Sequence, residues 1–169
     1  MNEIERLCAL LTRISAEEAW HGRGLAGLLA DVSAKEASAP LPSGSHTIWQ
    51  VVRHVIAWRE IARGLIDGGA RAQASAEENW PVIADTSDAA WKATLGELAE
   101  SGRRLEESIA RFPENRLDEP VSAYDASGAK GITYYQLLHG VIQHDVYHAG
   151  QIAILRNALR QKSSTADST

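Results

Sequence analysis

The sequence predicts an all-α protein, a four-helix bundle with long crossover loops, and three observations support this. The 169 residues are rich in alanine, which favours helix more than any other residue. Apolar residues recur at intervals of three and four rather than two, which is the period of a helix. This spacing runs through four separate segments, each of which presents one apolar stripe to its neighbours. We therefore expect a single bundle domain over residues 1–160 and a polar, disordered tail over 161–169.

Capping and helix-breaking residues give the expected ends of these helices. Glycine and proline interrupt the apolar stripes, and serine or threonine precedes the later helices. The expected helices run from about residue 2 to 33, from Ser45 or Thr47 to about Gly68, from Thr86 or Ser87 to just before Pro113, and from Thr133 to about residue 160. In the first helix, Gly22 and Gly24 predict a bend or an interruption, while Glu18 and His21 continue its stripe.

Two connections are long for a helical bundle, in which loops of about 2–8 residues are usual. The stretch 69–86 could span roughly 60 Å when extended, at about 3.3 Å per residue. The second helix, at about 1.5 Å per residue, is only about 35 Å long. This connection can therefore cross the whole bundle, so that the second and third helices run parallel. The stretch 113–132 leads into the helix that carries two histidines and is a candidate lid or pocket wall.

The composition argues against several classes of function. The chain carries 17 Lys and Arg against 22 Asp and Glu, without a basic cluster, which argues against nucleic-acid binding. No apolar run approaches the ~18 residues of a membrane span, and the acidic start of the chain does not resemble a secretory signal. The single cysteine, Cys8, fits a reducing cytosol and is expected in the core. We therefore expect a cytoplasmic protein that binds neither nucleic acid nor membrane.

Three histidines occupy positions at which the other stripes place Leu, Ile or Trp. His144 and His148 are four residues apart and share one helix face, and His54 lies in the stripe of the second helix. Three inward histidines without partners would each lose hydration at a cost. Zinc and similar ions bind neutral imidazole, and three protein ligands with an open fourth position is the pattern of catalytic sites. The spacing predicts a divalent-metal site; the alternative is three buried histidines hydrogen-bonded to carbonyls or carboxylates.

Other side chains are candidates for the surroundings of this site. They are Gln50 and Trp58, one turn before and after His54, with Tyr147, Gln151, His21 and His46. Structural packing is an equally compatible role for each of them, and the five tryptophans are expected mostly in the core or the pocket wall. A di-iron site of the ferritin type would need an inward glutamate on all four helices, which the later stripes lack.

Residues 45–58 and 144–152 resemble the two signature segments of the DinB/YfiT-like superfamily. Residues 20–22 and 79–81 also resemble parts of its pattern, and the resemblance extends from about residue 5 to 158. It implies a four-helix bundle in up-down-down-up order and a divalent metal ion held by His54, His144 and His148. It also implies a homodimer. One departure is Gln143, where related sequences often carry an acidic residue.

The same resemblance implies a class of reaction. Characterised members include transferases and isomerases that use the thiols bacillithiol, mycothiol or glutathione. We expect a metal-dependent enzyme that transfers a low-molecular-weight thiol to an electrophilic small molecule, because a divalent ion with three neutral ligands lowers the pKa of a bound thiol or water. Zinc or nickel is the expected metal, with iron or manganese as alternatives. Hydrolysis, a non-catalytic metal-binding or sensor module, and a plain bundle without metal are the alternative functions.

Overall fold

Four long helices dominate the computed structural model, which describes residues 1–16, 18–41, 44–121 and 131–166, with side chains as far as residue 162. The long helices are α1 (Glu3–Ser15), α4 (Ile48–Ile66), α6 (Asp88–Arg111) and α8 (Tyr134–Ala166). Shorter elements connect them: the antiparallel hairpin β1–β2 (Glu18–Ala19 and Gly22–Arg23), α2 (Leu25–Leu29), α3 (Ala34–Ser38), α5 (Ala76–Asn79) and the 3-10 turn η1 (Glu114–Arg116).

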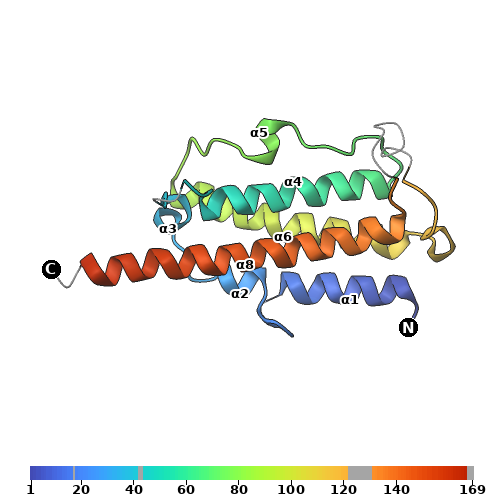
Figure 1. Cartoon of the computed structure of the whole chain (residues 1–169), viewed down its shortest axis with the longest axis horizontal. Helices are drawn as coiled ribbons and strands as arrows, with labels where there is room; N and C mark the ends of the chain where they lie inside the picture. The colour runs from blue at the N-terminus through green and yellow to red at the C-terminus, as the bar shows by residue number, and fades with distance from the viewer. Residues whose placement is uncertain (17, 42–43, 122–130, 167–169) are drawn as a thin grey trace.

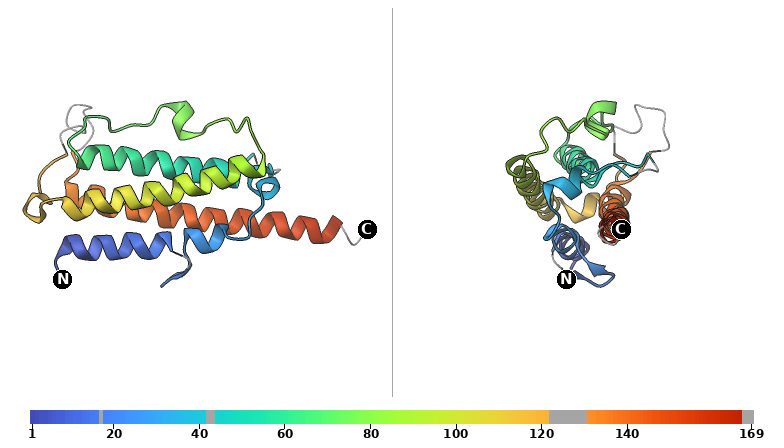
Figure 2. Two further views of the ribbon diagram at one scale, coloured as in Figure 1. Left: turned by 180° about the vertical axis from the view of Figure 1, so that it is seen from behind. Right: turned by 90° about the vertical axis from the view of Figure 1, so that its left-hand side faces the viewer.

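The helices form a bundle in up-down-down-up order, as predicted. Helices α1 and α8 run in one direction, and α4 and α6 run in the opposite direction (Figure 1). The connection from α4 to α6, which contains α5, returns along the length of α4, so that α4 and α6 are parallel (Figures 1 and 2). Both α4 and α1 pack against α6 and α8. The long crossover therefore lies over α4, the helix that carries His54.

Side-chain caps fix the starts of three helices where the sequence places them. At the start of α4, Thr47 Oγ1 accepts from the Gln50 backbone N–H at 3.2 Å, and Gln50 Oε1 accepts from the Thr47 N–H at 3.1 Å. Thr133 and Gln136 exchange the same pair of hydrogen bonds at 3.3 and 3.0 Å before α8. Ser87 caps α6. Each cap contributes about 1 kcal/mol to stability.

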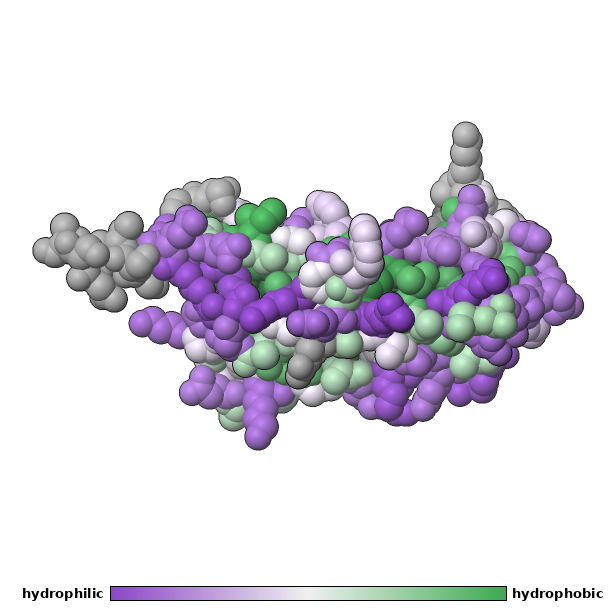
Figure 3. All heavy atoms as spheres, turned by 90° about the horizontal axis from the view of Figure 1, so that it is seen from below, coloured by the Kyte–Doolittle hydropathy of each residue, from purple (hydrophilic) through white to green (hydrophobic). Residues whose placement is uncertain are grey.

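The apolar stripes form one core in the middle of the bundle. Its most deeply buried aliphatic side chains come from all four long helices and include Leu7, Leu11, Val52, Val55, Leu105, Ile109, Leu138 and Ile152. On the face seen from below the bundle, hydrophilic residues predominate, with apolar residues between them (Figure 3). The described helices include none that is long and apolar enough to span a membrane.

The first predicted helix is interrupted near Gly22 and Gly24, as expected, but the interruption begins earlier and takes the form of a hairpin. Helix α1 ends at Ser15, and the chain then forms the β1–β2 hairpin before α2 begins. An added Cβ at Gly24 would lie 2.4 Å from the Ala16 carbonyl oxygen, so the tight return of the hairpin requires a glycine there. His21 is exposed in the hairpin turn, and Trp20 beside it is 97% exposed, against the expectation of a core or pocket position. The apolar stripe resumes in α2.

The C-terminal tail differs from expectation, whereas most of the candidate lid lies outside the described residues. Helix α8 continues to Ala166, so residues 161–166 are helical rather than part of a disordered tail; residues 167–169 lie outside the described part. Of the candidate lid 113–132, residues 122–130 lie outside it as well. The described portion contains η1 and a bridge between Pro120 and Thr133, which closes the loop at its base.

Candidate metal centre

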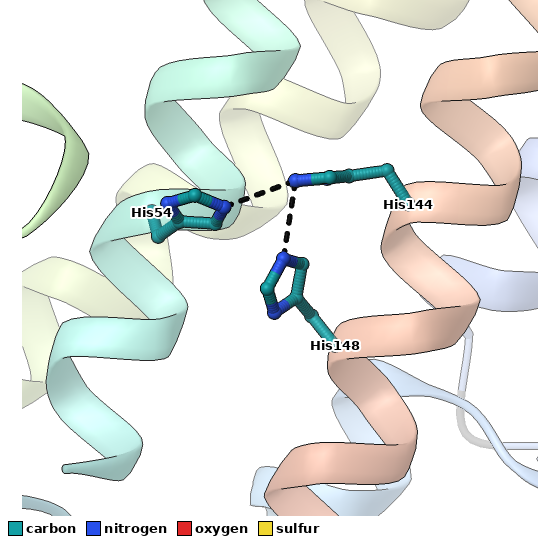
Figure 4. Close-up of side chains that lie close together, drawn as sticks. All are labelled: His54, His144 and His148. Carbon is teal, nitrogen blue, oxygen red and sulfur yellow. Dashed lines mark hydrogen bonds between the residues drawn. The ribbon is translucent and has the colours of Figure 1, made fainter. Parts of the chain in front are cut away.

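His54 from α4 and two histidines from α8, His144 and His148, meet in the interior of the bundle. The Nε2 atom of His144 lies 3.0 Å from Nε2 of His54 and 3.1 Å from Nε2 of His148 (Figure 4). His54 and His148 are 6% and 4% exposed, whereas the side chain of His144 is 26% exposed. The packing of α4 on α8 thus brings together the three residues that the sequence predicted as metal ligands.

Hydrogen bonds on the far side of two rings fix the direction of their lone pairs. His54 Nδ1 lies 3.0 Å from the Asn79 carbonyl oxygen, and His148 Nδ1 lies 2.8 Å from Gln151 Oε1. Both oxygens can only accept, so each Nδ1 carries the proton and donates. In the neutral rings Nε2 then holds a lone pair, and both lone pairs face the centre of the cluster. This is the ring orientation that outer hydrogen bonds impose on metal-binding histidines.

The residues present fit a divalent ion. A four-coordinate zinc ion bound at about 2.1 Å separates its nitrogen ligands by roughly 3.4 Å, which is close to the 3.0 and 3.1 Å spacing of the cluster. In addition, His144 Nδ1 and Asp145 Oδ1 are both buried without a hydrogen-bond partner among the described atoms and lie 4.0 Å apart. A hydrogen bond from Nδ1 to this carboxylate would leave Nε2 free for an ion, as is usual for metal-binding histidines.

Burial keeps two of the rings neutral at physiological pH. Loss of hydration is the main cause that lowers the pKa of His54 below its ordinary value, against the opposing hydrogen bond to Asn79. Loss of hydration, followed by the charge of His144, lowers the pKa of His148 to about 4. Both imidazoles therefore have an unprotonated Nε2 at neutral pH, which metal binding requires.

Residues of the crossover between α4 and α6 contact His54 and so support the cluster. The Trp80 ring is stacked on His54, with centroids 4.2 Å apart, and His46 is stacked on the other face of Trp80 at 3.5 Å. The Asn79 side-chain oxygen accepts from Trp58 Nε1 at 2.9 Å, so the residue that supports His54 also orients Trp58. The His54 ring is consequently held by contacts from a segment 25 residues further along the chain.

The other candidates lie at different distances from the cluster. Gln151 is hydrogen-bonded to His148, and the Trp58 ring lies 5.9 Å from the His144 ring. Gln50 does not bond to His54: its amide is engaged by Thr47 and by the Pro81 carbonyl at 3.2 Å. Tyr147 touches His148 with its ring but is 63% exposed. His46 reaches the cluster only through Trp80, and His21 lies in the hairpin turn.

Sequence reasoning missed a buried ion pair next to the cluster. Arg59 donates to Asp145 Oδ2 from Nε at 2.8 Å and lies 2.7 Å from it through Nη2. It also donates to Ser15 Oγ and to the Leu98 carbonyl, both at 3.0 Å, and so joins all four long helices. The sequence feature that could have indicated this ion pair is adjacency to the candidate site residues. Asp145 follows His144 directly, and Arg59 follows Trp58.

Three pockets of the described structure are lined in part by residues of α4, and one of them borders the cluster. A pocket of about 210 Å³ between α4 and α8 has His144 and Trp58 at one end. A larger hollow of about 630 Å³ lies between α4 and the crossover, lined by charged residues that include Arg53, Glu60 and Arg71, and by none of the three histidines. The smaller pocket therefore offers an approach to His144.

The fold and the site together define a class: a four-helix bundle with a buried three-histidine cluster that could hold a metal ion. Comparison with protein families agrees, because the model of the DinB superfamily matches residues 5–152. The chain belongs to the DinB superfamily, as its signature segments predicted. Neither the curated proteins nor the solved structures contain a match to this chain.

Proposed function

We propose that this protein is a divalent-metal-dependent enzyme that transfers a low-molecular-weight thiol to an electrophilic substrate. The observation that carries the proposal is the asymmetry of the cluster. His54 and His148 are buried and held from behind, whereas the partly exposed His144 borders a pocket. Three ligands on one side and an opening on the other is the arrangement of a catalytic rather than a structural metal site.

His54, His144 and His148 would hold the ion through their Nε2 atoms. When bound, the ion supplies a positive charge that lowers the pKa of a thiol and so increases its thiolate fraction. The protein's own contribution is to keep the imidazoles of His54 and His148 neutral, so that these ligands add no charge to that of the ion. Asn79 and Gln151 fix the rings of His54 and His148, and Trp58 forms a fixed wall beside His144.

The reaction is a substitution or addition at carbon. The thiol sulfur forms a bond to the electrophilic carbon, and the thiol proton passes to solvent. In a substitution the displaced group leaves with the electron pair of its bond; in an addition the π bond at that carbon breaks, and its electron pair takes up a proton from solvent. A donor set of three imidazoles suits zinc or nickel, with iron or manganese as alternatives. Hydrolysis at the same site would need water in place of the thiol.

Product formation with defined thiols tests the proposal. Metal-loaded protein is mixed with 1-chloro-2,4-dinitrobenzene and, in turn, cysteine, glutathione, bacillithiol or mycothiol, and the thioether and chloride are measured. We expect at least one thiol to react faster than with His148→Ala, while His139→Ala, on the same helix, behaves as the wild type. Cobalt-substituted protein should change its visible spectrum with that thiol.

Two results would count against thiol transfer. One is a loaded protein whose rates with every thiol equal those of His148→Ala. The other is cleavage of a nitrophenyl ester that needs the three histidines but no thiol, which would assign the site to hydrolysis instead.

A further inference from the structure

The pocket beside His144 is lined mainly by side chains of α4 and α8. It lies between α4 and α8, has a volume of about 210 Å³, and is bordered by the cluster through His144 and by Trp58. Its aliphatic walls include Ile61, Leu65, Leu137 and Val141. An occupant of this pocket therefore lies between the two helices that carry the histidines.

The described lining of this pocket contains no charged side chain apart from the titratable His144. Of its few polar side-chain atoms, Trp58 Nε1 donates to Asn79, and Gln136 Oε1 accepts from the Thr133 backbone N–H. A charged group that entered would lose its hydration without meeting an opposite charge on the aliphatic walls, which is costly. An uncharged apolar group would instead replace water on the aliphatic walls and gain free energy.

We infer that this pocket binds an uncharged apolar portion, aliphatic or aromatic, of the electrophilic substrate. The inference rests on the proposed function and names the class of its substrate. A dry apolar cavity of about 150 Å³ accommodates benzene, so 210 Å³ corresponds to roughly six to eight carbon atoms. The low-molecular-weight thiols expected as co-substrates carry charged and hydroxyl groups, which makes the electrophile the better occupant.

Hydroxamates of increasing chain length are suitable probes, because their head group chelates divalent ions and their tail reports on the pocket. We compare acetohydroxamate, butyrohydroxamate, hexanohydroxamate and adipic monohydroxamate on metal-loaded protein by calorimetric titration. Each methylene that enters the pocket should tighten binding about three- to fourfold. Hexanohydroxamate should then bind at least tenfold more tightly than acetohydroxamate. Adipic monohydroxamate, whose tail ends in a carboxylate, should bind no more tightly than acetohydroxamate.

Substitutions at two glycines test whether the hydroxamate tail lies in the pocket. Gly140 and Gly150 are both exposed on α8, and an added Cβ meets no atom within 4 Å at either position. Only Gly140 lines the pocket. We expect Gly140→Leu to weaken hexanohydroxamate at least tenfold and to leave acetohydroxamate within twofold. Gly150→Leu, the matched control, should leave both affinities within twofold of the wild type.

The possible outcomes separate this inference from the proposed function. If acetohydroxamate binds but longer tails add nothing, or the charged tail binds as well as the apolar one, the apolar-substrate inference is wrong and the metal site stands. Equal weakening by Gly140→Leu and Gly150→Leu also contradicts it. If the protein holds no metal and binds no hydroxamate, both fail. The wild-type series decides the matter even where a variant does not fold.

Discussion

Arg59 and Asp145 form an ion pair in the centre of the bundle, with side chains 1% and 0% exposed and a closest distance of 2.7 Å. Asp145 lies between the two cluster histidines of α8 in the sequence, and Arg59 lies on α4 one residue after Trp58. The pair therefore fixes the relative position of the two helices whose separation sets the distance between His54 and His144. Its hydrogen bonds to Ser15 and Leu98 extend this link to α1 and α6.

Asp145→Asn should destabilise the protein strongly. The variant leaves the buried Arg59 charge without its counter-charge, which typically costs about 3–5 kcal/mol in the free energy of unfolding. Chemical denaturation of the metal-free protein measures this. The control is Glu97→Gln, which removes the partner of Arg53 at the surface and should cost at most about 1 kcal/mol. Equal effects of the two variants would show that the buried pair does not organise the bundle.

Gly102→Ala should destabilise the protein, although alanine normally favours a helix. An added Cβ at Gly102 lies 2.9 Å from Arg59 Nη1, and the hydrogen bonds of Arg59 prevent the guanidinium from moving aside. Such overpacking costs about 1–3 kcal/mol. Gly96 on the same helix meets nothing within 4 Å, so Gly96→Ala should stabilise the protein by up to about 1 kcal/mol. Thermal unfolding measures the stability of both variants. If both stabilities changed in the same direction, this explanation would be contradicted.

The metal-free protein should lose stability as the pH falls from about 6.5 to 4. The pKa of His148 is lowered to about 4 in the folded state, against an ordinary value near 6.5 in the unfolded chain. Between these values the unfolded chain binds the extra proton, so acid favours unfolding. The expected loss from His148 between pH 7 and pH 5 is roughly 2 kcal/mol.

Denaturation of wild type and His148→Gln at pH 7 and pH 5 isolates this contribution from that of other groups. The wild type should lose more free energy of unfolding on acidification than the variant does. Equal losses in the two proteins would mean that His148 is not held neutral by its surroundings.

We expect the protein to be a homodimer that uses the outer face of α8. Tyr147 and Ile154 are seven residues apart on this helix and are 63% and 71% exposed, so they share a face that is apolar yet exposed in the single chain. Light scattering at micromolar concentration should give twice the chain mass. Ile154→Glu should give the mass of one chain, whereas Val82→Glu, at an 87% exposed residue of the crossover, should not change the assembly. A wild-type monomer would contradict the expectation.

The fold was largely predictable because its main determinants are local. The apolar stripes of three- and four-residue spacing gave the four long helices, and Thr47, Ser87 and Thr133 marked three of their starts. The hairpin after Ser15 was not predicted, because Glu18 and His21 happen to continue the helical spacing. The close approach of Gly24 to Ala16, which ends that helix, depends on the path of the chain rather than on its periodicity.

The three cluster histidines were predictable because each occupies an apolar position of its stripe. The residues that contact and orient these histidines were less predictable. The contact of Asn79 with both His54 and Trp58 depends on where the crossover runs; the family resemblance included residues 79–81 but did not say what they contact. The pairing of Arg59 with Asp145 joins residues 86 positions apart. Gln151 was found because it lies one turn from His148 on the same helix.

The metal content of single-histidine variants tests the central claim most directly. Elemental analysis of the purified wild type should find one divalent ion per chain, and His54→Ala, His144→Ala and His148→Ala should each bind none while keeping the helical circular-dichroism spectrum. His139→Ala, on the same helix but in contact with Glu3 rather than with the cluster, should retain the ion. Full metal content in the three cluster variants would show that these histidines are not the ligands, and the account of the site would be wrong.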